Sequence, residues 1–329
     1  MGEAEEQKLP VLVIDLGGTK IITALISHEC QMIAREYCPT LADEGPESVV
    51  GRMISAADHL LNLRNISPSQ LSSLSIASAG IIDMEKGVIT SSPNLPGWHD
   101  IPLRGIIEER YKISTFLLND ASAAALGEHR FGAGKGANNL IYITVSTGIG
   151  GGIIINGKLY LGSSGSAGEI GHATVDVNGP ECDCGNTGCL EVLASGTAVA
   201  REAIRRISRG ESSSLTEMVA GKIEDITAEK VSLAAQDGDS LASEVISKAA
   251  AYLGAGVVNL VNIFNPEVII IGGSMAKIGD LLFDPVRQVV KERAFQLSAQ
   301  AVRIVPAQLG DDVSVFGAAI FALEQKGSD

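Results

Sequence analysis

The sequence predicts an α/β fold in which one strand–turn–strand unit occurs twice. An apolar run at residues 10–16 ends at a Gly-Gly pair and resumes at residues 21–26, which is typical of two strands joined by a glycine turn. The same arrangement returns where an apolar run at residues 140–145 ends at a Ser-Thr-Gly turn and continues at residues 150–155. Because self-similarity of this kind indicates repeated structural units, we expect a duplicated α/β unit.

The remaining elements follow from periodicity and from turn residues. Apolar residues spaced by three and four predict helices, and short apolar runs bounded by glycine or polar residues predict strands. The expected helices cover residues 47–63, 120–129, 242–261 and 313–324, and the further expected strands cover residues 31–37, 74–79, 115–118, 159–161, 267–271 and 302–305. The glycine-rich residues 132–136 are expected to connect the two halves as a flexible segment.

Composition and charge exclude several classes of function. The net charge of −14 argues against a nucleic-acid partner, because phosphate binding requires clustered Lys and Arg. One basic run has the spacing of a solvated helix face, and it consists of Arg201, Arg205, Arg206 and Arg209. No run of about 18 uninterrupted apolar residues predicts a membrane span, and residues 1–10 lack the basic and apolar regions of a signal peptide. We therefore expect a cytoplasmic protein without a membrane partner.

A glycine turn follows the first expected strand at residues 15–20. Its two glycines carry no Cβ and its threonine carries a hydroxyl, so backbone N–H groups can face phosphate oxygens. Asp15 at the strand end can hold Mg²⁺ through water, since hard cations prefer oxygen ligands. A tight hairpin turn without any ligand accounts for a Gly-Gly pair equally well, so this motif by itself leaves both interpretations open.

Two further glycine sites strengthen the nucleotide hypothesis. Residues 146–152 place four glycines in one expected hairpin, which costs side-chain packing that we expect a bound phosphate to offset. Gly272 and Gly273 follow an apolar strand and are expected to lie against an adenine ring. None of these sites is a Walker A loop. The dinucleotide fingerprint is also absent, which argues against a nicotinamide enzyme. Three sites therefore predict one nucleotide bound from several sides.

Three cysteines lie close together in the sequence, at Cys182, Cys184 and Cys189. Glycines between them let the chain turn, and His172 stands upstream as a fourth ligand. Three Cys and one His form a common tetrahedral zinc shell, which is structural when it is closed. Cys30 and Cys38 lie outside this cluster, and we expect both to be buried core residues.

Asp120 ends an expected strand and begins an expected helix. Ligands of open α/β sheets gather at the carboxyl ends of strands, which makes this carboxylate a candidate catalytic group. The alternative is that Asn119 or Asp120 only caps the helix that follows. The local pattern favours capping, and the other motifs favour catalysis.

Together these motifs resemble the ROK family (repressors, open reading frames, sugar kinases) of the hexokinase–actin superfamily. The resemblance extends from Asp15 to about Ala322, and its most specific part is the ordered set Gly168-Glu169-Ile170-Gly171-His172, the three cysteines and Glu191. It implies an α/β fold of two ribonuclease H-like lobes of the actin/hexokinase type with a cleft between them. A small lobe would span residues 1–121 with a C-terminal helix at 312–329, and a large lobe with the zinc loop would span 122–311.

The resemblance also implies a function and roles for individual residues. The chain would be an ATP-dependent hexose kinase that uses Mg²⁺ and structural Zn²⁺, with Asp120 as the base that takes the proton from the sugar 6-hydroxyl. Sugar binding would involve Gly80, Asn94, Asn119, Asp120, Glu169, His172 and Glu191. Nucleotide binding would involve Asp15, Gly17, Gly18, Thr19, Lys20, Thr147, Gly148, Gly272 and Gly273. His172 would contact zinc with one ring nitrogen and the sugar with the other.

The choice of substrate stays open at this level. The motifs resemble those of glucokinases most, with fructokinases and kinases of N-acetylmannosamine or N-acetylglucosamine as alternatives, and polyphosphate as an alternative donor. A sugar-binding protein without kinase activity and a transcriptional repressor are further alternatives. A repressor of this family would carry a winged helix before the first glycine turn, where Asp15 leaves no room for one. The resemblance to the family also implies a homodimer.

Overall fold

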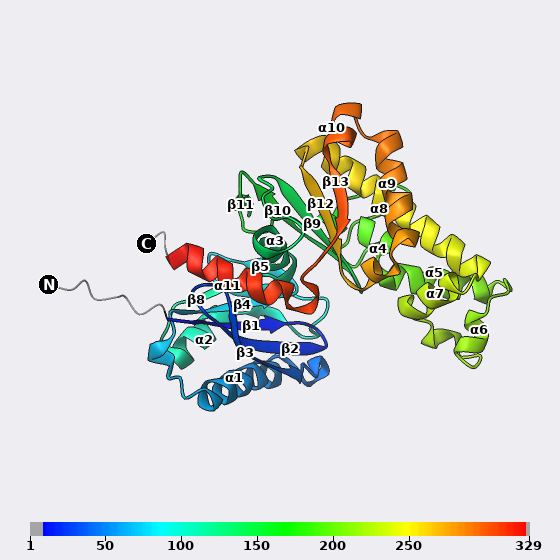
Figure 1. Ribbon diagram of the computed structural model, residues 1–329. Helices are drawn as coiled ribbons and strands as arrows, with labels where there is room; N and C mark the ends of the chain where they lie inside the picture. The colour runs from blue at the N-terminus through cyan, green and yellow to red at the C-terminus, as the bar shows by residue number, and fades with distance from the viewer. Residues whose placement is uncertain (1–8, 327–329) are drawn as a thin grey trace. The chain divides into compact units, whose positions relative to one another are not determined.

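The computed structural model describes residues 9–326, which divide into two compact units (Figure 1). The first unit contains the chain up to Gly132, the segment Leu159–Ala167 and the chain from Leu309 onward. The second unit contains Ala133–Lys158 and Gly168–Gln308. Residues 1–8, on which most of the signal-peptide expectation rests, lie outside the described residues.

The first unit is built on a five-stranded mixed sheet with the strand order β3-β2-β1-β4-β8. Strand β1 pairs antiparallel with β2 and β2 pairs antiparallel with β3, whereas β1, β4 and β8 run parallel. Strands β1 and β4 are buried along almost their whole length on both faces, although β4 carries serines at three positions. The strands are β1 Val11–Leu16, β2 Lys20–Ile26, β3 Met32–Pro39, β4 Ser73–Ser78 and β8 Thr115–Asn119.

Helices and a small second sheet complete the first unit. Helix α11 packs against α3 and against strands β1 and β4, and Figure 1 shows it in red beside α3. Helix α1 packs against β2 and β3. The helices are α1 Pro46–Leu63, α2 Leu103–Tyr111, α3 Asp120–Phe131 and α11 Val313–Lys326, and the small sheet consists of β5 Ile81–Asp83, β6 Val88–Ser91 and β7 His99–Ile101.

The second unit repeats the sheet of the first. Its strand order is β11-β10-β9-β12-β13, with β9 antiparallel to β10 and parallel to β12, and with β12 parallel to β13. The strands are β9 Leu140–Val145, β10 Ile149–Ile155, β11 Lys158–Leu159, β12 Val268–Gly272 and β13 Arg303–Pro306. The duplication predicted from the two strand–turn–strand patterns is therefore confirmed.

The second unit is richer in helices than the first. Its long helix α8 starts at the cap Asp239, whose side chain accepts a hydrogen bond from the Ala242 amide, and it ends at Asn265 in the left-handed conformation just before Pro266. By length and composition α8 could span a membrane, but 61% of its most apolar window is buried, as in a core helix. The helices are α4 Leu190–Ala194, α5 Gly196–Ser208, α6 Leu215–Met218, α7 Ala228–Gln236, α8 Ser240–Phe264, α9 Asp280–Arg293 and α10 Gln296–Ala301.

Two details differ from the sequence-based expectations. The division between the units falls at Gly132, after α3, and not after residue 121, because α3 packs with α11 and β8 of the first unit. Cys30 and Cys38 are only half-buried, so the prediction that both are core residues is wrong. Cys30 lies in the turn between β2 and β3 with a positive φ of 59°, and Cys38 lies on β3 at the end of the sheet order.

Candidate active site and metal centre

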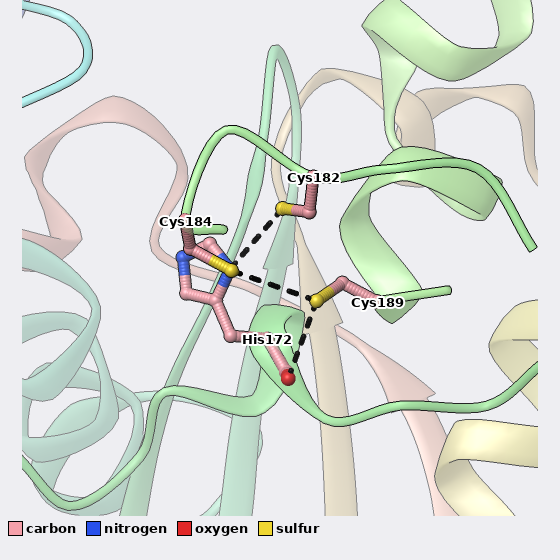
Figure 2. A group of neighbouring side chains, drawn as sticks. All are labelled: His172, Cys182, Cys184 and Cys189. Atoms are coloured by element: carbon pink, nitrogen blue, oxygen red, sulfur yellow. Dashed lines mark hydrogen bonds between the residues drawn. The ribbon is translucent and has the colours of Figure 1, made fainter. Parts of the chain in front are cut away.

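The four predicted metal ligands meet at one point in the second unit. One ligand atom from each of His172, Cys182, Cys184 and Cys189 lies within 4.8 Å of the others (Figure 2). The sulfurs of Cys184 and Cys189 are 3.7 Å apart, and the Cys182 sulfur is 3.7 Å from Nδ1 of His172. A tetrahedral shell with metal–sulfur bonds of about 2.3 Å has neighbouring ligand atoms about 3.8 Å apart. The donor set and its spacing therefore fit zinc.

The chemistry of the thiols fits the same conclusion. All five cysteines of the chain are free of disulfides. Burial, together with the neighbouring Cys184 thiol, raises the pKa of Cys189 to about 12, whereas the backbone N–H of Asn186 lowers the pKa of Cys184. Three thiols this close cannot all ionise without a compensating positive charge, and a divalent cation supplies it.

Tight turns in residues 173–189, which carry the three cysteines and are called the metal loop below, make this convergence possible. The segment forms isolated bridges between Thr174 and Cys189 and between Glu181 and Thr187. Gly188 has a φ of 66°, and a Cβ there would lie 1.6 Å from the carbonyl oxygen of Asp176. Only glycine fits such a position, so the glycine next to Cys189 serves the geometry of the loop.

The metal loop leads directly to a predicted sugar-binding carboxylate. Cys189 stands immediately before helix α4, and Glu191 lies in the first turn of that helix. The Oε2 atom of Glu191 accepts a hydrogen bond of 2.7 Å from the backbone N–H of Ile149. A Cβ on Gly148 would lie 2.3 Å from the same oxygen. The hairpin between β9 and β10 is therefore tied to the metal loop through Glu191.

The segment that carries Glu169 and His172 lies flat against strand β10. A Cβ on Gly171 would lie 2.1 Å from the Ile149 carbonyl oxygen, and a Cβ on Gly168 would lie 2.6 Å from the Gly151 carbonyl oxygen. On β10 itself, a Cβ on Gly151 would lie 2.3 Å from Cδ1 of Ile170 and 2.8 Å from the Gly168 carbonyl oxygen, so close packing accounts for this glycine. At Gly151 the absence of a side chain therefore has a packing reason, which the sequence-based argument did not include.

The second and third glycine sites lie next to each other. The hydroxyl oxygens of Ser146 and Ser274 are 3.1 Å apart. A Cβ on Gly272 would lie 2.3 Å from the Tyr142 hydroxyl, and one on Gly273, at a φ of 87°, would lie 2.3 Å from the Val145 carbonyl oxygen. Thr147 accepts hydrogen bonds through its carbonyl oxygen from Thr197, at the start of α5. The structure thus brings Thr147, Gly148, Gly272 and Gly273 to the same end of the second sheet.

In the first unit, Asn119 and Asp120 make different hydrogen bonds at the start of helix α3. The side-chain oxygen of Asn119 accepts hydrogen bonds from the amides of Ala121 and Ser122, so Asn119 is the cap of helix α3. Its Nδ2 donates to the carbonyl oxygen of Gly80, which fixes the predicted sugar-binding turn beside it. Oδ1 of Asp120 accepts from the Ala121 amide, and Oδ2 has no hydrogen-bond partner among the described residues.

Two carboxylates lie at this end of the first sheet. Burial raises the pKa of Asp120. Burial also raises the pKa of Asp15 to about 7, and the charge of Asp120 adds to this effect, whereas the Ser314 hydroxyl opposes it. Oγ of Ser314 donates a hydrogen bond of 2.6 Å to Oδ2 of Asp15. A raised pKa from burial and a like charge is common at functional sites.

The first glycine turn lies beside these carboxylates. A Cβ on Gly18 would lie 2.8 Å from the carbonyl oxygen of Asn94, so these two predicted site residues are neighbours. The backbone amide and the hydroxyl of Thr40 donate to the carbonyl oxygens of Thr19 and Gly17. Nζ of Lys20 lies 2.7 Å from Oδ2 of Asp311.

Sequence reasoning missed the residues that support the first turn. Ser314 and Thr40 belong to segments far from Asp15 in the sequence, and no motif marks them. One signal was available for Ser314, because a Gly-Asp-Asp run precedes the last helix and is polar where the chain is otherwise apolar.

A model of the ROK family matches residues 11–325. The chain belongs to the ROK family. It is 36% identical over 320 residues to the glucokinase of Thermotoga maritima, which covers 97% of this chain and 99% of that protein. It is 38% identical over 316 residues to the glucokinase of Halalkalibacterium halodurans, with 96% of this chain and 95% of that protein covered. The xylose repressor of Caldicellulosiruptor bescii is 33% identical over 93% of this chain and 76% of the repressor.

Solved structures agree with this assignment. The ROK family glucokinase from Streptomyces griseus, in complex with glucose and AMPPNP, has a TM-score of 0.82 at 32% identity and covers 96% of this chain and 99% of that chain. The ROK hexokinase from Thermus thermophilus has a TM-score of 0.81 at 32% identity and covers 98% and 100%. The predicted family and the predicted α/β fold of hexokinase type are therefore confirmed.

Proposed function

We propose that this ROK protein is an ATP-dependent glucokinase, which transfers the γ-phosphate of ATP to the 6-hydroxyl of glucose. The observation that carries the proposal is the division of tasks at the end of β8. Asn119 caps helix α3, so the half-buried carboxylate of Asp120 is available for chemistry. The similarity to glucokinases over almost the entire chain supports the same reaction.

Asp120 acts as general base in this proposal. Phosphoryl transfer depends mainly on positioning and on neutralising charge, and the protein must also accept the proton of the attacking hydroxyl. A carboxylate whose pKa is raised by burial is a stronger base than an exposed one. Gly80, Asn94 and Asn119 lie in the same unit and contribute the sugar contacts on that side.

The nucleotide is assigned to the three glycine turns. Asp15 holds Mg²⁺ through water, and the backbone of residues 17–20 together with Lys20 contacts the phosphates. In the second unit, Thr147 and Gly148 contact phosphate, and Gly272 with Gly273 lies against the adenine. The complex of the Streptomyces griseus glucokinase with AMPPNP supports ATP as the donor.

Zinc has a structural task in this proposal. His172, Cys182, Cys184 and Cys189 hold the ion, which supplies the positive charge that keeps three thiolates together. Nδ1 of His172 faces the thiols, which leaves Nε2 for a sugar hydroxyl. Glu169 and Glu191 provide further hydroxyl contacts from the same loop and from the helix that follows it.

The test is a coupled assay of ADP formation with the purified protein across a panel of acceptors. Glucose should give the highest kcat/KM, followed by mannose and fructose, with the two N-acetyl sugars far behind. Fastest turnover on an N-acetyl sugar would overturn the glucose assignment and leave the kinase assignment intact. Polyphosphate and ADP are added as donors in parallel, and ATP should exceed both.

A repressor function is the second candidate, because relatives named xylose repressor match most of the chain. A gel-shift experiment with genomic DNA fragments tests it, and specific binding would support a regulator. We expect no binding, since the net charge of −14 opposes DNA. We also propose a cytoplasmic homodimer, which light scattering of the purified protein can test.

A further inference from the structure

The basic run on helix α5, expected to be a uniformly solvated face, divides into two groups. Arg206 forms ion pairs with Glu211 and Glu244, and Arg209 is exposed at the end of the helix. Arg201 and Arg205 instead line a pocket, together with Lys248 of helix α8. Both arginines are exposed, as expected for a solvated helix face, and they also border this pocket.

The pocket lies entirely within the second unit and has a volume of about 320 Å³. Its floor is apolar and consists of the buried side chains of Ala198, Val199, Val245 and Ala249. Its walls come from residues 178–180 of the metal loop, from Val192 and Leu193 of helix α4, and from α5 and α8. A volume near the lower end of the range for ligand pockets suits a small metabolite.

Positive charge is concentrated at this pocket. Glu202 accepts hydrogen bonds from Arg205, at 2.7 and 2.8 Å, and from Lys248, at 3.1 Å, so one carboxylate holds two cations side by side. These contacts lower the pKa of Glu202 to about 2, so it stays ionised. Arg201 donates to the Val192 carbonyl oxygen and has no carboxylate partner among the described residues.

One further carboxylate lines the pocket and is already engaged. Asp176 accepts hydrogen bonds from the hydroxyl of Tyr252, at 3.4 Å, and from the amide of Asn178, at 3.0 Å. Three cationic side chains therefore face two carboxylates, in a chain whose net charge is −14. A local excess of Arg and Lys over an apolar floor attracts an anion that also has a carbon skeleton.

We propose that this pocket binds a phosphate monoester of a small metabolite. Arg201, Arg205 and Lys248 contact the phosphate, and the carbon skeleton covers the apolar floor. Because the walls include the metal loop and the helix that carries Glu191, the bound ligand restrains both segments. The pocket would be a regulatory site for a phosphorylated sugar or a related metabolite, and its existence does not depend on the proposed kinase reaction.

Calorimetric titration of the zinc-loaded protein without ATP tests the proposal, with glucose 6-phosphate and inorganic phosphate as the probes. Arg201→Ala combined with Lys248→Ala should weaken binding of glucose 6-phosphate at one site about tenfold or more, because charge-assisted hydrogen bonds are lost. The matched control is Arg209→Ala, on the same helix but outside the pocket, which should bind as the wild type does. Melting curves verify that the variants fold.

Two outcomes would overturn the proposal. Equal affinities of the double variant and of Arg209→Ala would exclude the pocket as the binding site. Equal affinities of the wild type for inorganic phosphate and glucose 6-phosphate would exclude a role of the carbon skeleton and reduce the site to one for free phosphate. Hydrogen exchange supplies a second readout, since the ester should slow exchange at residues 176–180 and 190–194 in the wild type alone.

Discussion

The two strand–turn–strand hairpins of this ROK protein share a topology and differ in what lies against them. The hairpin of β1 and β2 has its turn beside two carboxylates, Asp15 and Asp120, both with raised pKa values. The hairpin of β9 and β10 has its turn tied to Glu191 and its strand covered by the segment that carries His172. In the proposed function the first hairpin belongs to the site of proton transfer, whereas the contacts described for the second hairpin are packing contacts.

The two copies of the duplicated unit are therefore held in place by different kinds of contact. In the first unit, side chains around the turn are fixed by hydrogen bonds from distant segments, such as Ser314 and Thr40. In the second unit, glycines let backbone lie on backbone, and the cluster of His172 with three cysteines joins the covering segment to the loop that follows it. Damage to the first hairpin should therefore reduce the rate, and damage to the second should reduce binding and stability.

The largest effect is expected for Asp120→Asn. The amide keeps the size of the side chain and removes the base, so kcat should fall by about 10² to 10⁴-fold while the KM for glucose changes little. Steady-state kinetics measure both constants, and Ser122→Ala on the same helix is the control. If Asp120→Asn keeps its kcat, Asp120 is not the base.

Loss of the metal should change the KM for glucose rather than kcat. Cys184→Ser, or treatment with a strong chelator, should raise the KM for glucose by about 10 to 100-fold and lower the melting temperature, because metal binding contributes to folding and orients His172. Cys38→Ser is the matched control, since Cys38 lies outside the cluster. A chelated protein with unchanged KM and melting temperature would contradict the structural role of zinc.

Adding a single methyl group at Gly171 tests whether the second hairpin depends on close packing. In Gly171→Ala the added Cβ would lie 2.1 Å from the Ile149 carbonyl oxygen, and backbone cannot move aside cheaply. We expect a loss of about 1–3 kcal/mol in the free energy of unfolding, as for other overpacked positions, and weaker glucose binding. Gly105→Ala in α2 meets nothing within 4 Å and should stabilise the protein by roughly 0.5–1 kcal/mol. Urea unfolding compares the two, and equal stability would refute the packing role of Gly171.

The last expected effect concerns Asp15 and pH. Its pKa rises from 3.8 to about 7 on folding, so between these values the folded protein holds a proton that the unfolded chain has lost. The free energy of unfolding should therefore decline as the pH rises through this range, and Asp15→Asn should flatten that decline. Urea unfolding at several pH values without divalent cations measures it, with the exposed Asp43→Asn as control. Parallel curves for Asp15→Asn and the wild type would show that Asp15 is not perturbed.

Much of the fold could be predicted from the sequence, because it is encoded locally. Apolar periodicity located the long helix and the paired strands, and the repeated strand–turn–strand pattern predicted the duplication. The candidate metal ligands could be found in the same way, since Cys182, Cys184 and Cys189 are close in the chain and this spacing is typical of zinc sites.

Only the tertiary structure decided what the individual side chains do. The sequence by itself determined that a carboxylate stands at the start of α3, but it could not assign capping to Asn119 and leave Asp120 for chemistry, because that depends on the φ and ψ angles of the cap. Nor could it explain Gly151 of β10, which packs against a covering segment beyond the end of that strand. Local patterns specify elements because they reflect the backbone alone, whereas contacts between distant segments exist only once the chain has folded.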